Sequence, residues 1–314
     1  MVIDPSGRIL ANARSRNGKL ICEVEDIHWK YQRSDSFGGT MINNDWFIEK
    51  GRTPWSYRPA GSSVRPDDRR MPYPRVCAHR GFCQIAPENT LPAFGAAIAL
   101  GADEIELDLR QTADGVPVVI HDSVLERVSN GTGDISAKTL AELKELDFGS
   151  KSGAAFAGLK IATFEEVLKR FPRQTVFNVH IKSPDSVGYL QKIVQLIRDY
   201  DCLDHVYVAG GGDVMEAMRE VAPSIPRCLI IGHNPERIDV VSIAVRYGCA
   251  KIQFMKPWLD REMIEKVHAN DIRCNLFWCD DPTEAAEYLA LGVDTILTNN
   301  YWQIARIVHP GIGG

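Results

Sequence analysis

The sequence lacks any long apolar run, any CxxC pair and any excess of basic residues. No window holds the roughly eighteen uncharged apolar residues that a membrane-spanning helix needs, so we expect no membrane span. Its 36 basic and 41 acidic residues give a net charge of −5, which argues against a general nucleic-acid binder or a binder of anionic membranes. The eight cysteines are scattered, several of them in apolar strand-like runs, where a free thiol behaves as a small hydrophobe. This usage predicts a reducing compartment, and we expect the cytoplasm.

The composition is typical of a globular domain preceded by a segment of different character. Apolar residues make up 45% of the 314 residues and charged residues 25%, enough for a sizeable core. Near the start, VIDPSGRILANARSRNGKLICEVED predicts two strands flanking the turn signals PSG and RNG. Residues 53–74 are rich in Pro, Arg and Ser, as in a linker or a strap on a domain surface. We therefore expect an N-terminal β-hairpin extension (1–55), a linker (56–74) and a main domain (75–314).

From residue 75 onward, strand and helix patterns alternate. The predicted strands are 75–80, 104–110, 116–121, 175–181, 205–209, 227–231, 250–254, 273–279 and 294–298. The predicted helices are 90–100, 139–147, 163–171, 186–199, 212–221, 236–247, 260–269 and 282–291. Repeated βα alternation over about 240 residues predicts a parallel (βα)8 TIM barrel.

Nine predicted strands are one too many for this barrel. Only about five residues separate the second and third strands, whereas a parallel crossover needs a dozen or more. The link contains ADG, a hairpin-type turn. We therefore expect 116–121 to fold back antiparallel on 104–110, which brings His121 close to Glu106 and Asp108.

The strand EIELDL places three acidic residues on one face. Side chains alternate along a strand, so Glu104, Glu106 and Asp108 lie on the same side. Inward-facing carboxylates repel one another and lose hydration unless a cation such as Mg²⁺ or Ca²⁺ lies between them. A solvated edge strand would carry the same pattern with the acids facing water, and this segment alone does not decide between the two.

The stretch HRG ends the first predicted strand, at the face where barrel active sites assemble. His79 is a candidate general acid or base, and Arg80 a candidate phosphate contact. In the following PENT, Glu88 is a candidate carboxylate beside a metal, whereas Asn89 and Thr90 are better explained as a helix N-cap.

Two further strands carry polar residues at positions where a barrel strand is expected to be apolar. VVIHD ends in His121, a second imidazole that could share acid and base roles with His79, and in Asp122, which fits a turn. In FNVHIK, His180 and Lys182 share one face, the first as a candidate metal ligand or base and the second as a candidate phosphate contact. A strand with one wet face would explain the same pattern.

In order and spacing, these motifs resemble the glycerophosphodiester phosphodiesterase family of phospholipase-C-like barrels. The matching stretches are HRG (79–81), PENT (87–90), ELD (106–108), DGVPVVIHD (114–122), LERVSNGTGDISAKTLAELKELDFGS (125–150), IATFEEVL (161–168), IK (181–182) and FWCDDPTEAAEYLALGVDTILTNN (277–300). The resemblance covers roughly residues 75–300.

The resemblance implies a (βα)8 phosphoric diester hydrolase that uses a divalent metal, Mg²⁺ or Ca²⁺. Its small-molecule substrates would be glycerophosphodiesters, cleaved to sn-glycerol 3-phosphate and an alcohol. Residues around 122–160 would form an insertion over the glycerol pocket. Carried over position by position, it implies an acid/base pair of His79 and His121, phosphate contacts from Arg80 and Lys182, metal ligands Glu106 and Asp108 with Glu88 alongside, and Trp278 in the substrate pocket.

This chain departs from the family pattern at two positions. His180 stands where the family has a glutamate metal ligand, a change that favours Mn²⁺ or Zn²⁺ and makes His180 the third ligand expected here. Asn299 stands where the family often has an acid. These departures keep an alternative open, a catalytically weakened barrel that acts as a phosphoester-binding or regulatory module.

The first 55 residues faintly resemble the C-terminal end of a carbon–nitrogen hydrolase (nitrilase-like) domain, through D-P-x-G followed by a returning strand. The catalytic cysteine of such a domain would lie upstream of this segment. The resemblance therefore implies an extension without its own catalysis.

Overall fold

The computed structural model describes residues 66–231 and 239–310, together with four short strands nearer the N-terminus. Strands β1 (Val2–Ile3) and β2 (Ile9–Ala11) pair antiparallel, as do β3 (Gln32–Ser34) and β4 (Met41–Asn43). The residues that join β1 to β2, and the predicted RNG turn, lie outside the described residues. The chain divides into two compact units, Met1–Tyr57 and Arg58–Gly314.

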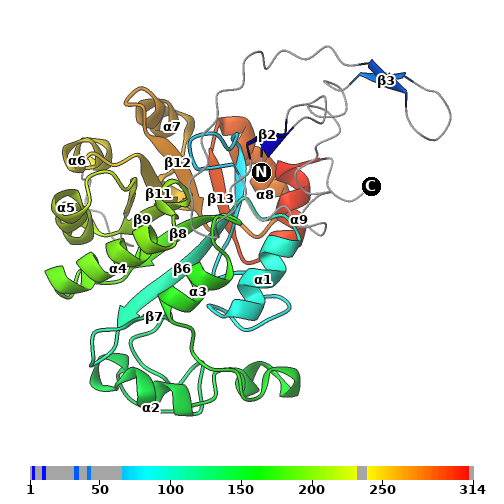
Figure 1. Ribbon diagram of the computed structural model, residues 1–314. Helices are drawn as coiled ribbons and strands as arrows, with labels where there is room; N and C mark the ends of the chain where they lie inside the picture. The colour runs from blue at the N-terminus through cyan, green and yellow to red at the C-terminus, as the bar shows by residue number, and fades with distance from the viewer. Residues whose placement is uncertain are drawn as a thin grey trace. The chain divides into compact units, whose positions relative to one another are not determined.

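The second unit contains the predicted barrel, closed by eight parallel strands. In chain order they are β5 (Arg75–Ala78), β6 (Glu104–Gln111), β8 (Val176–Ile181), β9 (Val206–Gly210), β10 (Arg227–Ile230), β11 (Lys251–Met255), β12 (Arg273–Phe277) and β13 (Thr295–Thr298). Each strand pairs with the next, and β13 returns to β5 to close the ring. Figure 1 shows the strands at the centre with helices outside them.

The ninth predicted strand is a hairpin partner and not a stave of the barrel. β7 (Pro117–Val119) runs antiparallel to β6, with Leu109 opposite Val119. This antiparallel pairing confirms the predicted hairpin. Its physical reason is that the ADG link is too short for a crossover to a parallel position.

Each predicted helix is found. They are α1 (Leu91–Ala99), α2 (Leu140–Glu145), α3 (Phe164–Arg170), α4 (Val187–Asp199), α5 (Gly212–Val221), α6 (Val240–Tyr247), α7 (Arg261–His268) and α8 (Pro282–Leu291), and a further helix, α9 (Tyr301–Val308), follows β13. The limits of α8 follow directly from its sequence. Asp281 accepts hydrogen bonds from the first-turn amides, Pro282 occupies the first turn, and Gly292 ends the helix with φ at +108°.

The insertion (residues 122–160) has a small core of its own beside the barrel. Its apolar side chains pack with those of β7, in a cluster made of Val118, Ile120, Leu125, Ile135, Leu143, Phe148 and Ile161. In Figure 1 this region and α2 form a lobe next to β7. The lobe therefore extends from the end of the hairpin that carries His121.

Residues 66–74, within the predicted linker, form a strap across the N-terminal end of the barrel. The strap places Asp68 2.5 Å from Arg75 and 2.9 Å from Lys251, both of which are buried. Glu104 lies 2.9 Å from Arg75 and completes a cluster of two cations and two anions. Met71 packs against barrel-lining side chains, including Tyr207. The strap thus closes the end of the barrel opposite the site described below.

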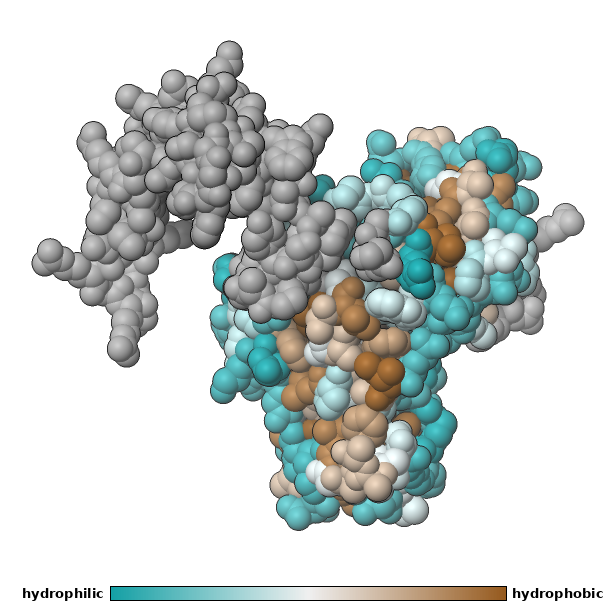
Figure 2. All heavy atoms as spheres, turned by 90° about the vertical axis from the view of Figure 1, so that its right-hand side faces the viewer, coloured by the Kyte–Doolittle hydropathy of each residue, from teal (hydrophilic) through white to brown (hydrophobic). Residues whose placement is uncertain are grey.

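The exterior is mixed in character. Figure 2, which views the side that lies on the right in Figure 1, shows a band of hydrophobic residues between hydrophilic ones. Within residues 66–231 and 239–310, no helix has both the length and the apolar character that crossing a membrane requires.

Candidate active site

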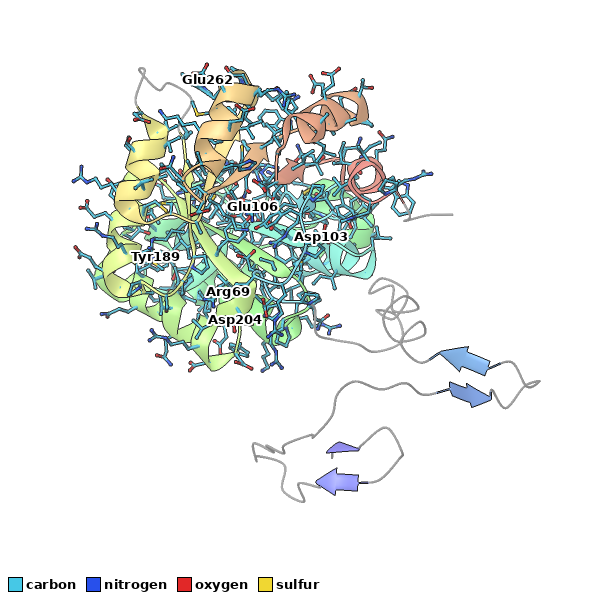
Figure 3. The ribbon with its side chains drawn as sticks, turned by 90° about the horizontal axis from the view of Figure 1, so that it is seen from above. Arg69, Asp103, Glu106, Tyr189, Asp204 and Glu262 are labelled. Atoms are coloured by element: carbon cyan, nitrogen blue, oxygen red, sulfur yellow. The ribbon has the colours of Figure 1, made fainter. Side chains whose placement is uncertain are left out.

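Two carboxylates from β6 lie inside the barrel. Glu106 is 3% exposed and Asp108 is fully buried. β6 pairs with β8 on one side, so that Asp108 stands opposite His180. Figure 3, a view from above, shows Glu106 near the centre of the barrel, whereas Glu262 lies at the periphery, on the outer helix α7. The interpretation of 104–110 as a solvated edge strand is therefore wrong.

Glu106, Asp108 and His180 form a group that could hold a metal ion. One ligand atom from each lies within 4.8 Å of the others. His180 Nδ1 is 3.2 Å from Asp108 Oδ1 and 3.6 Å from Glu106 Oε1. Burial disfavours the imidazolium, but the neighbouring carboxylates of Asp108 and Glu106 outweigh it and raise the pKa of His180. Two buried carboxylates and an imidazole are a suitable donor set for a divalent cation.

Lys182 and Arg80 surround Asp108 with positive charge. Lys182 Nζ lies 2.7 Å from Asp108 Oδ1, and Arg80 Nε lies 3.4 Å from Oδ2. Burial would raise the pKa of Asp108, but its contact with His180 and the charges of Lys182 and Arg80 hold that pKa well below its usual range. Asp108 is therefore a carboxylate at neutral pH.

His79 is held at the end of β5 by contacts on two sides. Its Nδ1 lies 2.7 Å from Asn299 Oδ1, and its ring meets the edge of Phe277 at a centroid distance of 5.0 Å. Its Nε2 lies 3.9 Å from Glu106 Oε2. The free ring nitrogen therefore faces the group of metal-ligating side chains.

The His121 ring forms a hydrogen bond with the side chain of Asp122. From the sequence, Asp122 was predicted only as a turn residue. His121 Nδ1 lies 2.7 Å from Asp122 Oδ1, and Arg127 Nε donates to Asp122 Oδ2 at 2.5 Å. The hydrogen bond from Arg127 lowers the pKa of Asp122 to about 2. Burial lowers the pKa of His121, so its imidazole is mostly neutral at pH 7.

Two residues of PENT have other contacts than those expected. Glu88 accepts hydrogen bonds from Arg80 and Arg127, and it is not part of the group of Glu106, Asp108 and His180. Asn89 does not cap α1, because Thr90 does so alone. The Asn89 side chain instead donates to Asp108 Oδ2 at 2.8 Å and accepts from the Asp108 amide. Asn89 therefore orients the Asp108 carboxylate, a contact that was not predicted from the sequence.

The glycine of HRG is required by its backbone. Gly81 has φ at +86°, and a Cβ on it would lie 2.8 Å from two atoms of Ala93. Only glycine adopts this conformation in that space. The close approach to α1 fixes the turn that presents His79 and Arg80.

A cavity of about 310 Å³ lies beside these residues, between the loop before α1, the hairpin and the insertion. Its lining includes Glu88, His121, Arg127, Lys151 and Phe156. Trp278 follows β12, is 42% exposed and is not among the lining residues. Its assignment to the substrate pocket stays a prediction.

Comparison with known proteins identifies the family. The family model described as "Glycerophosphoryl diester phosphodiesterase family" matches residues 79–301. The chain belongs to this family. A glycerophosphodiester phosphodiesterase of Caldanaerobacter subterraneus subsp. tengcongensis is 30% identical over 240 residues, which cover 75% of this chain and 98% of the relative.

Two solved phosphodiesterase structures share the fold. An Oleispira antarctica phosphodiesterase, solved with the product sn-glycerol-3-phosphate, matches with a TM-score of 0.70 at 24% identity. The match covers 75% of this chain and 97% of the Oleispira chain. A glycerophosphodiester phosphodiesterase from Agrobacterium tumefaciens has a TM-score of 0.66 at 25% identity, covering 75% and 99%. The family match leaves residues 1–78 outside, so the fainter resemblance of the first 55 residues stays a prediction.

Within this member of the glycerophosphoryl diester phosphodiesterase family, three contributors escaped the sequence analysis. Arg127, Asp280 and the side chain of Asn89 each bind a predicted site residue or that residue's partner. Asp122 and Asn299 were noted, but not as partners of His121 and His79. One signal was present for Asp122, because a carboxylate next to a strand-end histidine is well placed to orient it.

Proposed function

We propose that this protein hydrolyses glycerophosphodiesters to sn-glycerol 3-phosphate and an alcohol with the aid of a divalent metal ion. One observation carries the proposal: two buried carboxylates and an imidazole converge within 4.8 Å beside the cations Arg80 and Lys182. Family membership and the Caldanaerobacter relative support the same reaction.

The phosphate of the substrate is anionic, and two side chains of this site match it. Lys182 carries a point charge, and Arg80 offers several N–H donors. Among the described residues, the buried Nε of Arg80 has an ion-pair contact with Asp108 Oδ2 at 3.4 Å but makes no hydrogen bond. A phosphate oxygen would satisfy this donor, as arginine forks commonly do.

Glu106, Asp108 and His180 would hold the metal ion. When bound, the ion supplies positive charge that polarises the phosphoryl oxygens and neutralises charge that develops on them. Mg²⁺ and Ca²⁺ suit the two carboxylates, whereas the nitrogen of His180 favours Mn²⁺ or Zn²⁺. Glu88 forms ion pairs with Arg80 and Arg127, so its role here is to orient Arg80.

His79 and His121 would divide the proton transfers. In each ring Nδ1 contacts an oxygen of a neighbouring side chain, which leaves Nε2 for the substrate. The oxygen of a water molecule bonds to phosphorus as the bond from phosphorus to the alcohol oxygen breaks. One imidazole takes a proton from the water, and the other gives a proton to the departing alcohol oxygen.

We also propose a reducing compartment such as the cytoplasm. We further propose that residues 1–55 form an extension and 56–74 a linker to the barrel domain 75–314, with the last part of the linker, residues 66–74, packed onto that domain. Among the described residues, seven cysteines are free thiols and six of these are buried. Thiols of this kind fit a compartment in which disulfides do not form.

The test of the proposed function is release of sn-glycerol 3-phosphate from glycerophosphocholine or glycerophosphoethanolamine. The purified protein is assayed with Mg²⁺, Ca²⁺, Mn²⁺ and Zn²⁺ in turn. We expect turnover with at least one metal and a loss of about 10²-fold or more in kcat for His79→Ala and His121→Ala. His268→Gln, a histidine paired with Asp294 and remote from these contacts, is the matched control and should stay within about twofold.

Two results would count against hydrolysis. Absence of turnover with every metal, with the substrate still binding to His79→Ala as tightly as to the parent, would favour the phosphoester-binding module. Equal losses for His268→Gln and His79→Ala would mean that the assay reports folding and not catalysis.

A further inference from the structure

Three side chains form a chain of contacts that ends at His79. Asp280 follows β12, and Asn299 follows β13, so both lie at the C-terminal ends of their strands. Asp280 Oδ2 lies 3.0 Å from Asn299 Nδ2, and Asn299 Oδ1 lies 2.7 Å from His79 Nδ1. Asp280 Oδ1 accepts from the amide of Asn299 at 2.7 Å and from the hydroxyl of Thr298 at 2.9 Å.

The chemistry of these groups leaves one arrangement of protons. A carboxylate only accepts hydrogen bonds, so the atom of Asn299 that meets Asp280 Oδ2 must be its NH₂ group. The oxygen of the same amide then faces His79, and an amide oxygen is also an acceptor only. His79 Nδ1 must therefore carry a proton, and in the neutral ring the lone pair resides on Nε2.

We propose that Asp280 and Asn299 are positioning residues that fix His79 in the Nδ1–H tautomer, so that Nε2 can exchange a proton with the substrate. The inference rests on the proposed function, which assigns acid/base chemistry to His79. Asp280 touches neither His79 nor the metal-ligating group through any contact in the described structure; it acts through the orientation of the Asn299 amide. Phe277, which meets the His79 ring edge-on, limits its rotation.

Each single substitution breaks this chain in a defined way. In Asp280→Asn, the new amide oxygen is needed to accept from Thr298 and from the backbone amide of Asn299, so the new NH₂ group faces the NH₂ group of Asn299. This clash of two donors is relieved if the Asn299 amide turns over and presents its NH₂ group to His79. Nδ1 would then have to accept, and the ring would take the other tautomer. Asn299→Asp instead places two carboxylates in contact, which repel one another.

The two substitutions together restore the pattern. In the double variant Asp280→Asn with Asn299→Asp, the amide oxygen introduced at position 280 can accept from Thr298 and from the backbone amide of residue 299, as Asp280 Oδ1 does. The NH₂ group at position 280 then donates to the carboxylate at position 299, which accepts from His79 Nδ1. The double variant has the same atoms and net charge as the parent at these two positions, with the amide and the carboxylate exchanged.

The experiment measures kcat, KM and the His79 tautomer in the parent, both single variants and the double variant. ¹⁵N NMR of histidine-labelled protein reports the tautomer, and the His79 signal is the one that His79→Ala lacks. A wrong tautomer costs about 10⁴-fold in kcat in serine proteases, so we expect Asp280→Asn to lose about 10²-fold or more with KM within about threefold. We expect the double variant to regain at least about tenfold and the Nδ1–H signal. Asp281→Asn, which changes the adjacent carboxylate that caps α8, is the matched control and should keep the parent tautomer and kcat within about twofold.

Four results are decisive. An unchanged tautomer in Asp280→Asn, or a double variant no better than the singles, overturns the inference. A changed tautomer with unchanged kcat supports the chain of contacts from Asp280 to His79 and instead contradicts the proposed role of His79 in catalysis. If Asp280→Asn does not fold, Asn299→Leu takes its place: it removes the acceptor, and a His79 ring that still shows only Nδ1–H overturns the inference.

Discussion

The guanidinium of Arg127 binds the carboxylate of Glu88 through two hydrogen bonds, of 2.7 and 2.8 Å, across 39 residues of sequence. The same guanidinium donates to Asp122, which holds His121, while Glu88 accepts from Arg80. One side chain of the insertion thereby connects the partner of a proposed acid/base residue with the partner of a proposed phosphate contact.

Replacement of Arg127 by Gln should lower kcat/KM by about tenfold. The change removes three charge-assisted hydrogen bonds, but the side chain is 46% exposed, so solvent compensates for part of the loss. Steady-state kinetics on glycerophosphocholine measure the effect. Arg173→Gln, which breaks an exposed ion pair with Asp201 elsewhere on the surface, should change kcat/KM by less than about twofold. Equal effects of the two substitutions would show that the Arg127 contacts do not position the site.

Replacement of His180 by Glu should change the metal preference. Exchange of the imidazole for a charged oxygen ligand should shift binding from Mn²⁺ and Zn²⁺ toward Mg²⁺ and Ca²⁺, by about tenfold in relative affinity. Metal analysis of the purified protein, followed by titration calorimetry with each ion, measures this without reference to activity. If metal content and preference are the same in both proteins, His180 is not a ligand.

Replacement of Asp68 by Asn should destabilise the barrel by about 2–4 kcal/mol, because Arg75 and Lys251 would remain buried with one carboxylate between them. Urea unfolding at pH 7 measures the loss. Asp201→Asn, at a side chain that is 82% exposed, should change the free energy of unfolding by less than about 0.5 kcal/mol. A loss for Asp68→Asn no larger than that of Asp201→Asn would contradict the stabilising role of this cluster.

The same carboxyl predicts a pH dependence. Burial would raise the pKa of Asp68, but Lys251 and Arg75 outweigh it and hold that pKa below its ordinary value of 3.8. Since the folded-state pKa is the lower one, the stabilisation is fully present above about pH 4 and is lost as the pH falls through the folded-state value. The difference between the parent and Asp68→Asn should therefore be constant from about pH 5 to 7 and shrink in more acidic solution. A difference that grows on acidification would contradict this.

Substitution of Gly81 by Ala should cost more than the same change at Gly133. The φ angle is +86° at Gly81 and +87° at Gly133, so both substitutions incur about 1 kcal/mol of backbone strain. Only at Gly81 does the new Cβ meet other atoms, 2.8 Å away in α1, which adds about 1–3 kcal/mol. Urea unfolding of both variants isolates the steric part, and equal losses would show that α1 moves away without cost.

Local patterns sufficed to predict most of the barrel. The alternation in EIELDL placed Glu106 and Asp108 on one face of their strand, and the closed barrel decides that this face points inward. The hairpin could be predicted because five residues cannot make a parallel crossover. Helix α9, which follows the last strand, was not predicted.

The contacts that orient the site could not be predicted in the same way. His79 and Asn299 are 220 residues apart, and their contact depends on closure of the ring between β5 and β13. Strand order places the two ends side by side, but only the packed structure decides that the Asn299 amide faces the ring. The contact of Arg127 with Glu88 likewise depends on how the insertion packs on the hairpin.

The strap has a consequence for how the gene can be shortened. The family match begins at residue 79 and the first barrel strand at residue 75, yet Asp68 and Met71 complete the closed end of the barrel. A polypeptide that starts at either of those boundaries would expose Tyr207 and leave Lys251 with half of its counter-charge. The smallest fragment expected to fold on its own therefore begins no later than residue 66.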